Sequence, residues 1–135
     1  MSTVAPVKRA LVQTMRASSP LVAAIRGGIT EGMAPRKVKY PFIVFALVAA
    51  PYERQFDGKQ IHALFDISAF AENPVDASNV DALINDALDD VDVVVDGQTT
   101  LLCRRVAELP TGAERDSRGR RIYQIGASYS VWTDV

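Results

Sequence analysis

The segment Glu72–Val91, ENPVDASNVDALINDALDDV, has the residue spacing of an amphipathic helix. Its apolar side chains recur at intervals of three and four residues and so share one face, while polar side chains take the other. Either Asn73, which precedes Pro74, or Ser78 can cap the first turn. The apolar positions are Val80, Leu83, Ile84, Ala87, Leu88 and Val91, and the polar positions are Asp81, Asn85, Asp86, Asp89 and Asp90.

Strand-like segments flank this helix on both sides. Residues Pro41–Pro51, PFIVFALVAAP, are apolar at nearly every position, which predicts a strand buried on both faces. The next segment, Ile61–Ala69, alternates apolar and polar residues, and the turn signal in FDGK, Phe56–Lys59, joins the two strands into a hairpin. After the helix we predict a short strand, a turn at Asp96-Gly97 and a longer strand, Thr99–Leu109.

The two ends of the chain supply two more helices and a last strand. The first helix presents one apolar face, formed by Val7, Leu11 and Met15. A second, short helix begins at Pro20, is capped by Ser19, and is followed by a loop over Gly28–Tyr40 with one short extended piece. The last strand has one face formed by Tyr123, Ile125, Ala127, Tyr129 and Val131.

This order of elements predicts an α+β fold. Hairpin-length connections on both sides of the main helix favour a mostly antiparallel β-sheet of about four to five strands, with two to three helices packed on one face. A chain of 135 residues is near the commonest domain size, so we expect one domain over residues 1–135 with one core.

The composition is that of an ordinary globular protein. Hydrophobic residues make up 48% and charged residues 23%, and the formal net charge of −1 gives no global attraction to nucleic acid. The single cysteine, Cys103, excludes an internal disulfide and fits a reducing compartment. No signal peptide is recognised, and the longest apolar run, Pro41–Pro51, is far shorter than the ~20 residues of a membrane-spanning helix. We expect a soluble protein.

No catalytic, cofactor or metal site is predicted. Gly27–Gly32 has the glycine spacing of a phosphate-binding loop but lacks the lysine and hydroxyl residue that should follow. The acidic residues from Asp86 to Asp96 do not fit a calcium loop, because valines occupy a ligand position and the glycine position. His62 is the only histidine, and Cys103 has no histidine predicted beside it, so no triad forms within one chain.

Four arginines precede the last strand, and a tryptophan ends it. They are Arg115, Arg118, Arg120 and Arg121, followed by Trp132. The arginines can form a solvated loop tip, contact carboxylates of a partner protein, or contact nucleic acid; the last hypothesis lacks a supporting aromatic platform or groove-reading helix. A tryptophan so late in the chain is either core or an interface residue.

The order and pattern of these segments resemble the tail completion and tail terminator proteins of long-tailed bacteriophages. The similarity is carried by the first helix, a short glycine-ended second helix, PFIVFALV, KQIHALFDISAFAEN, ALINDALDD and the final DSRGRRIYQIGASYSVW. It covers most of the chain, and it contains no catalytic motif. The segment Gly32–Lys39 is the least diagnostic part.

The resemblance implies a structural virion protein located in the tail or neck and assembled in the host cytoplasm. It implies a homohexameric ring that caps the tail tube, ends tube polymerisation and contributes to head–tail joining, with no cofactor, no enzyme activity and no membrane. The implied partners are further copies of the chain, the tail tube protein and the head-completion or stopper proteins, while phage DNA passes through the lumen without specific binding. Reach to these partners would come from the loops Tyr52–Lys59 and Pro110–Arg121.

Three alternatives stay open on the sequence alone. A head-completion or stopper protein of the neck has a similar size and equally lacks chemistry. A small oligomeric enzyme would complete His62 or Cys103 with another subunit. A cytoplasmic binding module would be a stable monomer with a small ligand.

Overall fold

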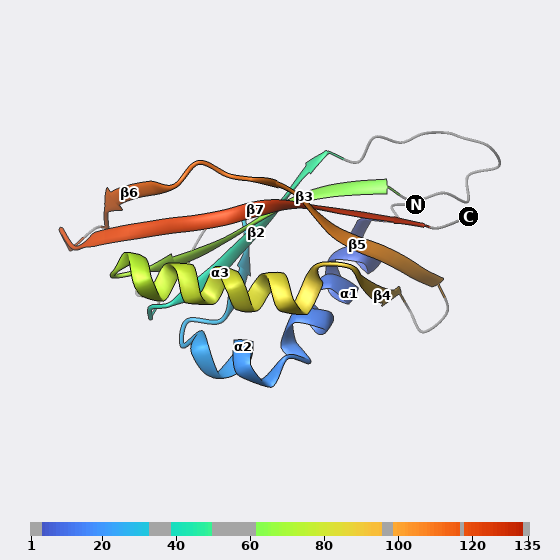
Figure 1. The fold of residues 1–135 in the computed structure, drawn as a ribbon, viewed down its shortest axis with the longest axis horizontal. Coiled ribbons are helices and arrows are strands. Elements are labelled where there is room, and N and C mark those ends of the chain that lie inside the picture. Colours follow the sequence, from blue (N-terminus) through green and yellow to red (C-terminus); the bar gives the residue numbers. More distant parts are fainter. Residues whose placement is uncertain (1–3, 33–38, 50–61, 96–98, 117, 134–135) are drawn as a thin grey trace.

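The fold is one curled sheet with three helices on one of its faces (Figure 1). The computed structural model describes residues 4–32, 39–49, 62–95, 99–116 and 118–133. The helices are α1 (Val4–Arg16), α2 (Ser19–Ala24) and α3 (Pro74–Leu88). The strands are β1 (Ile29–Glu31), β2 (Phe42–Ala49), β3 (His62–Ala71), β4 (Val91–Val95), β5 (Thr99–Glu108), β6 (Gly112–Arg115) and β7 (Arg121–Thr133).

The strand order is β1-β2-β3-β7-β5-β4. Strand β6 pairs with the first part of β7, on the same edge of β7 that pairs with β5 further along. All pairings are antiparallel except that of β1 with β2. The predicted α+β class and mostly antiparallel sheet are confirmed, but four to five strands was too low, because the described residues form seven. The strands beyond that number are β1, a three-residue strand where the sequence predicted only a short extended piece, and β6, whose sequence GAER has no apolar alternation.

Helices α2 and α3 each begin after a residue whose side chain caps the first turn. Asn73 caps α3 by accepting a hydrogen bond from the backbone N–H of Asp76 at 2.8 Å, so the alternative cap at Ser78 is wrong. The cap of α2 is Ser18 rather than the predicted Ser19, and it accepts from the N–H of Leu21.

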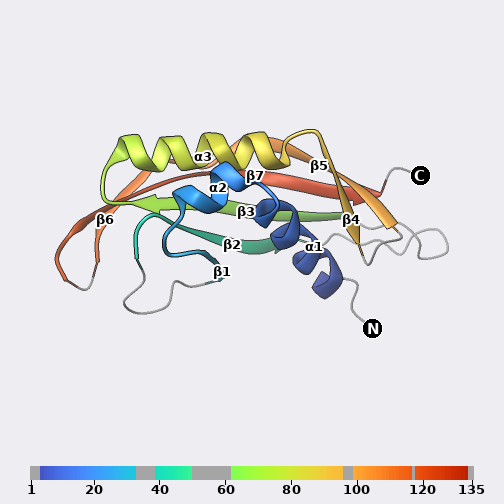
Figure 2. The same cartoon turned by 90° about the horizontal axis from the view of Figure 1, so that it is seen from below.

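The core lies between these helices and the sheet. Helix α3 packs on β3 and β7, α1 packs near β4, and α2 contacts α3 (Figure 2). Residues that are completely buried there include Val7, Leu11 and Met15 of α1, Ile84 and Leu88 of α3, Phe65 and Ile67 of β3, and Tyr129 and Val131 of β7. The predicted apolar face of the first helix is therefore confirmed.

The opposite face of the sheet has no helix on it among the described elements (Figures 1 and 2). Strand β2 is buried on both faces at its start, where Phe42 and Ile43 are buried, but not at its end, where Val48 is 53% exposed, so the predicted burial on both faces holds for only part of the strand. Between β3 and β7 this face is polar: Ser128 donates to Asp66 at 2.6 Å and Gln124 donates to Ser68 at 3.1 Å. These bonds connect the two central strands at the side-chain level.

Some predictions fall outside the described residues. These are the turn at Phe56–Lys59, the turn at Asp96-Gly97, the candidate loop Tyr52–Lys59 and residues 33–38 of the segment Gly32–Lys39.

Candidate functional site

The predicted polar loop Pro110–Arg121 is in large part a β-hairpin. Strand β6 pairs with β7 from Gly112 opposite Gln124 to Arg115 opposite Arg121, and the hairpin extends past the first turn of α3 (Figure 1). Only the short tip between Arg115 and Arg121, which lie opposite each other in the two strands, is a turn. The chain reverses there with Gly119 at φ 80°, a backbone conformation that glycine adopts without strain.

The carboxylate of Asp116 organises the tip of this hairpin. One oxygen, Oδ1, accepts hydrogen bonds from the backbone N–H groups of Arg118 and Arg120, each at 2.9 Å. Backbone bonds from Asp116 N–H to the Arg120 carbonyl and from Gly119 N–H to the Asp116 carbonyl close the turn. Charge-assisted bonds of this kind are about twice as strong as neutral ones, so they favour one position of the Arg118 and Arg120 backbone relative to Asp116.

Two contacts attach the tip to the body of the protein. The hydroxyl of Tyr40 donates to Oδ2 of Asp116 at 3.1 Å, and Arg120 forms an ion pair of 3.5 Å with Glu72, just before α3. The hydrogen bond from the backbone of Arg120, with further help from Arg118 and Tyr40, holds the pKa of Asp116 below its ordinary value. Burial, and then the bond to Asp116, raises the pKa of Tyr40. Asp116 is therefore ionised and Tyr40 protonated near neutral pH.

The four arginines of the hairpin have different surroundings. Arg115 donates to the carbonyl of Gly119 at 2.7 Å, and Arg120 is paired with Glu72. Within the described part of the chain, the side chains of Arg118 and Arg121 form no hydrogen bond or ion pair and are exposed. Arg115 and Arg120 are exposed as well, but each contacts another residue of the protein.

Trp132, the remaining predicted interface residue, lies at the other end of β7 from these arginines. It is 44% exposed, and it is paired in register with Leu102 of β5 on one side and with His62 of β3 on the other. Because side chains alternate along a strand, Trp132 shares the helix-free face of the sheet with Ser128 and Ser130. The structure does not bring Trp132 and the arginine tip together.

The acidic positions of α3 and the turn after it also separate into paired and unpaired groups. Asp89 accepts a bond from the backbone N–H of Arg105, and Asp90 pairs with Arg104 at 3.5 Å. Asp86 and Asp92 are exposed, and no residue in the described segments forms a hydrogen bond or ion pair with their carboxylates. Asp90 has a positive φ of 58°, as a residue of this type tolerates in a tight turn.

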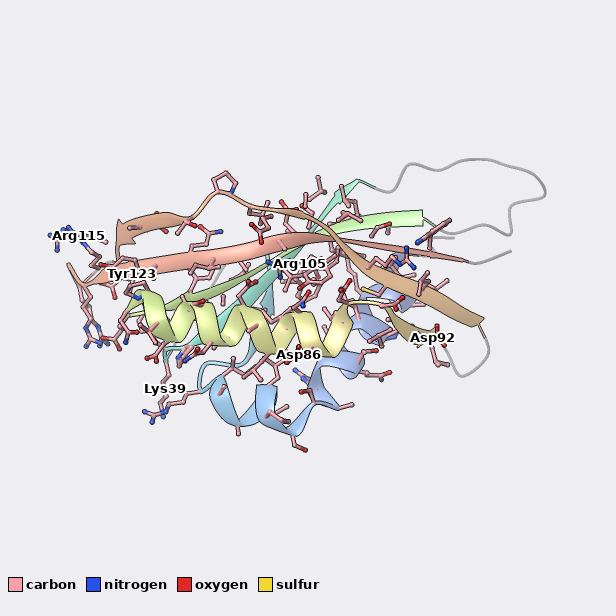
Figure 3. The ribbon with its side chains drawn as sticks, in the orientation of Figure 1. Lys39, Asp86, Asp92, Arg105, Arg115 and Tyr123 are labelled. Carbon is pink, nitrogen blue, oxygen red and sulfur yellow. The ribbon has the colours of Figure 1, made fainter. Side chains whose placement is uncertain are left out.

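One acidic residue was predicted wrongly. Asp81 was expected on the solvent face of the helix, but it is only 9% exposed and forms a two-pronged ion pair with Arg105 of β5, at 3.1 and 3.3 Å. The same guanidinium donates to the hydroxyl of Tyr129 at 3.1 Å. Figure 3 shows Arg105 between the sheet and α3. Asp81, Arg105 and Tyr129 form a buried triad of hydrogen-bonded side chains that attaches α3 to the sheet.

The electrostatics of this triad fit a structural role. Burial acts to lower the pKa of Arg105, but the hydrogen bonds to Asp81 and Tyr129 outweigh it and raise the pKa. Burial raises the pKa of Tyr129 to about 12, with Arg105 opposing. Both groups keep their protons over the whole physiological range, so neither can transfer a proton near neutral pH.

No other described group offers a reactive centre. Cys103 is completely buried, and burial, followed by the charge of Asp89, raises the pKa of its thiol to about 12. Among the described residues there is no cluster of three or more histidine, cysteine or acidic side chains that could hold a metal ion. The helices of the described part are all too short or too polar to cross a membrane.

Comparisons with known proteins place the chain in a family. A chain from the virion of a native gene transfer agent particle has the same fold, with a TM-score of 0.63 and 18% identity, over 93% of this chain and 92% of its own. The bacteriophage SPP1 gp17 protein matches with a TM-score of 0.56 and 16% identity, over 98% of this chain and 93% of its own. No curated protein sequence matches.

The strongest result comes from the sequence family. The family model described as tail completion protein gp17 matches residues 9–134, which is almost the entire chain. The resemblance inferred from the sequence pattern is thereby confirmed. The chain belongs to the tail completion protein gp17 family, and it is a structural protein of the phage tail, not an enzyme.

Proposed function

We propose that this chain, acting as one tail terminator-like domain over residues 1–135, forms a ring at the end of the tail tube. The ring is a homohexamer that stops tube polymerisation and offers a surface for joining the head. Family membership supports the tail location. The observation that carries the ring itself is the ordered cationic hairpin, which extends from the body of the protomer and is held by Asp116.

Charge distribution supports contacts of the head-to-tail type. The hairpin and the acidic positions of α3 and β4 lie on different parts of the surface, with Arg115 at one end of the long axis, Asp92 toward the other and Asp86 between them (Figure 3). A subunit with two different complementary surfaces generates a ring when the rotation closes. Opposite charges on the two surfaces guide the orientation of each contact.

The remaining partners follow from this position at the end of the tail. The tube protein contacts one side of the ring and the neck proteins the other, and phage DNA passes through the lumen without specific binding. Trp132 contributes to one of these contacts, because a large aromatic side chain that is 44% exposed is typical of interface residues.

The experiment is negative-stain microscopy of the purified protein, alone and mixed with tail tubes of the same phage. We expect rings in solution or caps at one end of the tubes, and tube growth that stops when the protein is added. Native mass spectrometry of the assembled material then gives the number of subunits, for which we expect six. A protein that stays monodisperse in both samples, with tubes that continue to grow, would contradict the proposal.

A further inference from the structure

Two arginines and two aspartates form no hydrogen bond or ion pair through their side chains within the described part of this chain. Charged residues next to them in the sequence do form ion pairs. Arg118 and Arg121 are unpaired while Arg120 binds Glu72. Asp86 and Asp92 are unpaired in the same sense, while Asp90 binds Arg104. The hairpin that carries the two arginines extends past the start of α3 (Figure 1), whereas Asp86 and Asp92 lie away from it on α3 and β4 (Figure 3). These cations and anions can therefore neutralise one another between two molecules.

The hairpin tip is built to present its two unpaired arginines. Three hydrogen bonds to Asp116 fix the backbone of the turn and attach it to the body through Tyr40. A segment that is already ordered loses little conformational entropy when it binds. Guanidinium groups bind carboxylates through two parallel hydrogen bonds, which gives such a contact direction as well as energy.

We propose that Arg118 and Arg121 of one copy bind the acidic segment Asp86–Asp92 of the next copy. The proposal rests on the ring proposed above and names the contact that closes it. The hairpin segment 114–121 contains four arginines and two acidic residues, a net formal charge of +2, and the segment 86–92 contains four aspartates and no cation, a net charge of −4. Arg115 and Arg120 hold the hairpin and do not take part in the contact.

A second copy explains more of the surface than nucleic acid does. A phosphate backbone would also be attracted to Arg118 and Arg121, but it leaves the unpaired Asp86 and Asp92 without a role and is repelled by them. A neighbouring copy satisfies both sets in one contact. It also explains why the two sets differ in sign and position on the same protomer.

The test is an exchange of charges between the two surfaces. The first variant is Arg118→Glu with Arg121→Glu, and the second is Asp86→Arg with Asp92→Arg. Each variant alone places like charges at residues 86 and 92 and at residues 118 and 121 in every contact, so we expect it to lose rings in solution or caps on tubes. An equal mixture restores opposite charges in every contact if the two variants alternate. We expect the mixture to recover assembly, with native mass spectrometry showing even-numbered rings that contain equal numbers of each variant.

A matched control changes the net charge by the same amount as the arginine variant, at two positions outside both segments. Arg16→Glu with Arg26→Glu alters two exposed arginines near the ends of α1 and α2, and we expect it to assemble like the wild type. Far-UV circular dichroism verifies that every variant is folded before assembly is measured. The wild-type protein is measured in parallel on the same tubes.

The outcomes separate this inference from the proposed function. If the wild type forms rings or caps and the Arg118→Glu, Arg121→Glu variant does so equally well, the contact is wrong and the ring stands. If both variants fail alone and their mixture fails too, the pairing of these two segments is wrong. If that arginine variant assembles normally but loses binding to double-stranded DNA at low salt, the tip serves nucleic acid. If the wild type never assembles, the proposed function fails first.

A further variant tests the role of tip order. Asp116→Ala removes a negative charge and so makes the net charge of the tip more positive, but it also removes the hydrogen-bond acceptor that fixes the turn. We expect assembly to require about tenfold more protein, because the freed tip must be ordered on binding. Assembly at a lower concentration than the wild type would show that net charge alone governs the contact, and would overturn the part of the proposal that concerns tip order.

Discussion

Replacing Arg105 by leucine is expected to destabilise the protein strongly, because it leaves a carboxylate buried without a partner. The side chains of Arg105 and Asp81 are 18% and 13% exposed, and the ion pair joins β5 to α3. Removing one member of a buried pair costs more than the pair contributes, since the remaining charge keeps its desolvation penalty. The hydroxyl of Tyr129 loses its hydrogen-bond donor in the same variant.

The expected cost is about 3 kcal/mol for Arg105→Leu, at the lower end of the range for buried pairs because this pair is not fully enclosed. Removing the other member of the pair, by Asp81→Leu, should cost about 2 kcal/mol, because the long side chain of Arg105 can reach solvent and keeps its ion pair with Glu108 at 3.6 Å. The double variant should cost clearly less than the two together, since no unpaired charge is left. The neighbouring pair Arg104–Asp90 is exposed, so Arg104→Leu should cost about 0–1 kcal/mol.

The assay is urea unfolding followed by far-UV circular dichroism, with all four variants and the wild type at one protein concentration. The free energy of unfolding comes from linear extrapolation, and the pair Arg105 and Asp81 forms a double-mutant cycle. The fixed concentration matters because assembly would add apparent stability. If Arg105→Leu costs no more than Arg104→Leu, the reasoning from burial is refuted.

Two further predictions concern the sheet. Gly126→Ala should lower the free energy of unfolding by about 3 kcal/mol in the same assay, because the added Cβ would lie 2.4 Å from the carbonyl oxygen of Ile67 on the paired strand. The control is Gly112→Ala, whose added Cβ would lie 3.6 Å from its nearest atom, and we expect it to cost less than about 1 kcal/mol. Equal costs for the two variants would contradict the packing explanation. The Cys103 thiol, with its pKa raised to about 12 by burial, should stay unreactive toward a thiol reagent at pH 8 until urea unfolds the chain, and fast labelling of the native protein would show that it is accessible.

Local signals account for most of what could be predicted. The spacing of Val7, Leu11 and Met15, the cap at Asn73 and the alternation along β3 each depend on neighbours in the sequence, and each is found in the structure. Strand β6 has no such signal. Its polar residues form a strand only because β7 offers a free edge beside Gln124, beyond the end of β5.

The buried triad was missed because its members are far apart in the sequence. Helical spacing alone puts Asp81 with the polar residues, and its partner Arg105 follows 24 positions later. One signal was present: Arg105 is in period-two register with Cys103 and Leu101, so it faces the core with them. A cation on a buried face requires a buried anion, which directs attention to the acidic residue of α3 closest to its apolar stripe.

The position of β7 has a consequence for how the chain folds during synthesis. It is the last described strand in the sequence, yet it lies between β3 and β5 at the centre of the sheet, and those two strands are joined only through it. A chain made from its N-terminus therefore holds two incomplete half-sheets with unpaired edges until β7 emerges. Pairings so distant in sequence form slowly. The sheet is completed when β7 pairs with both of its neighbours. The contacts that join the hairpin tip to Tyr40 and Glu72 are also distant in sequence, so they too depend on the docking of β7.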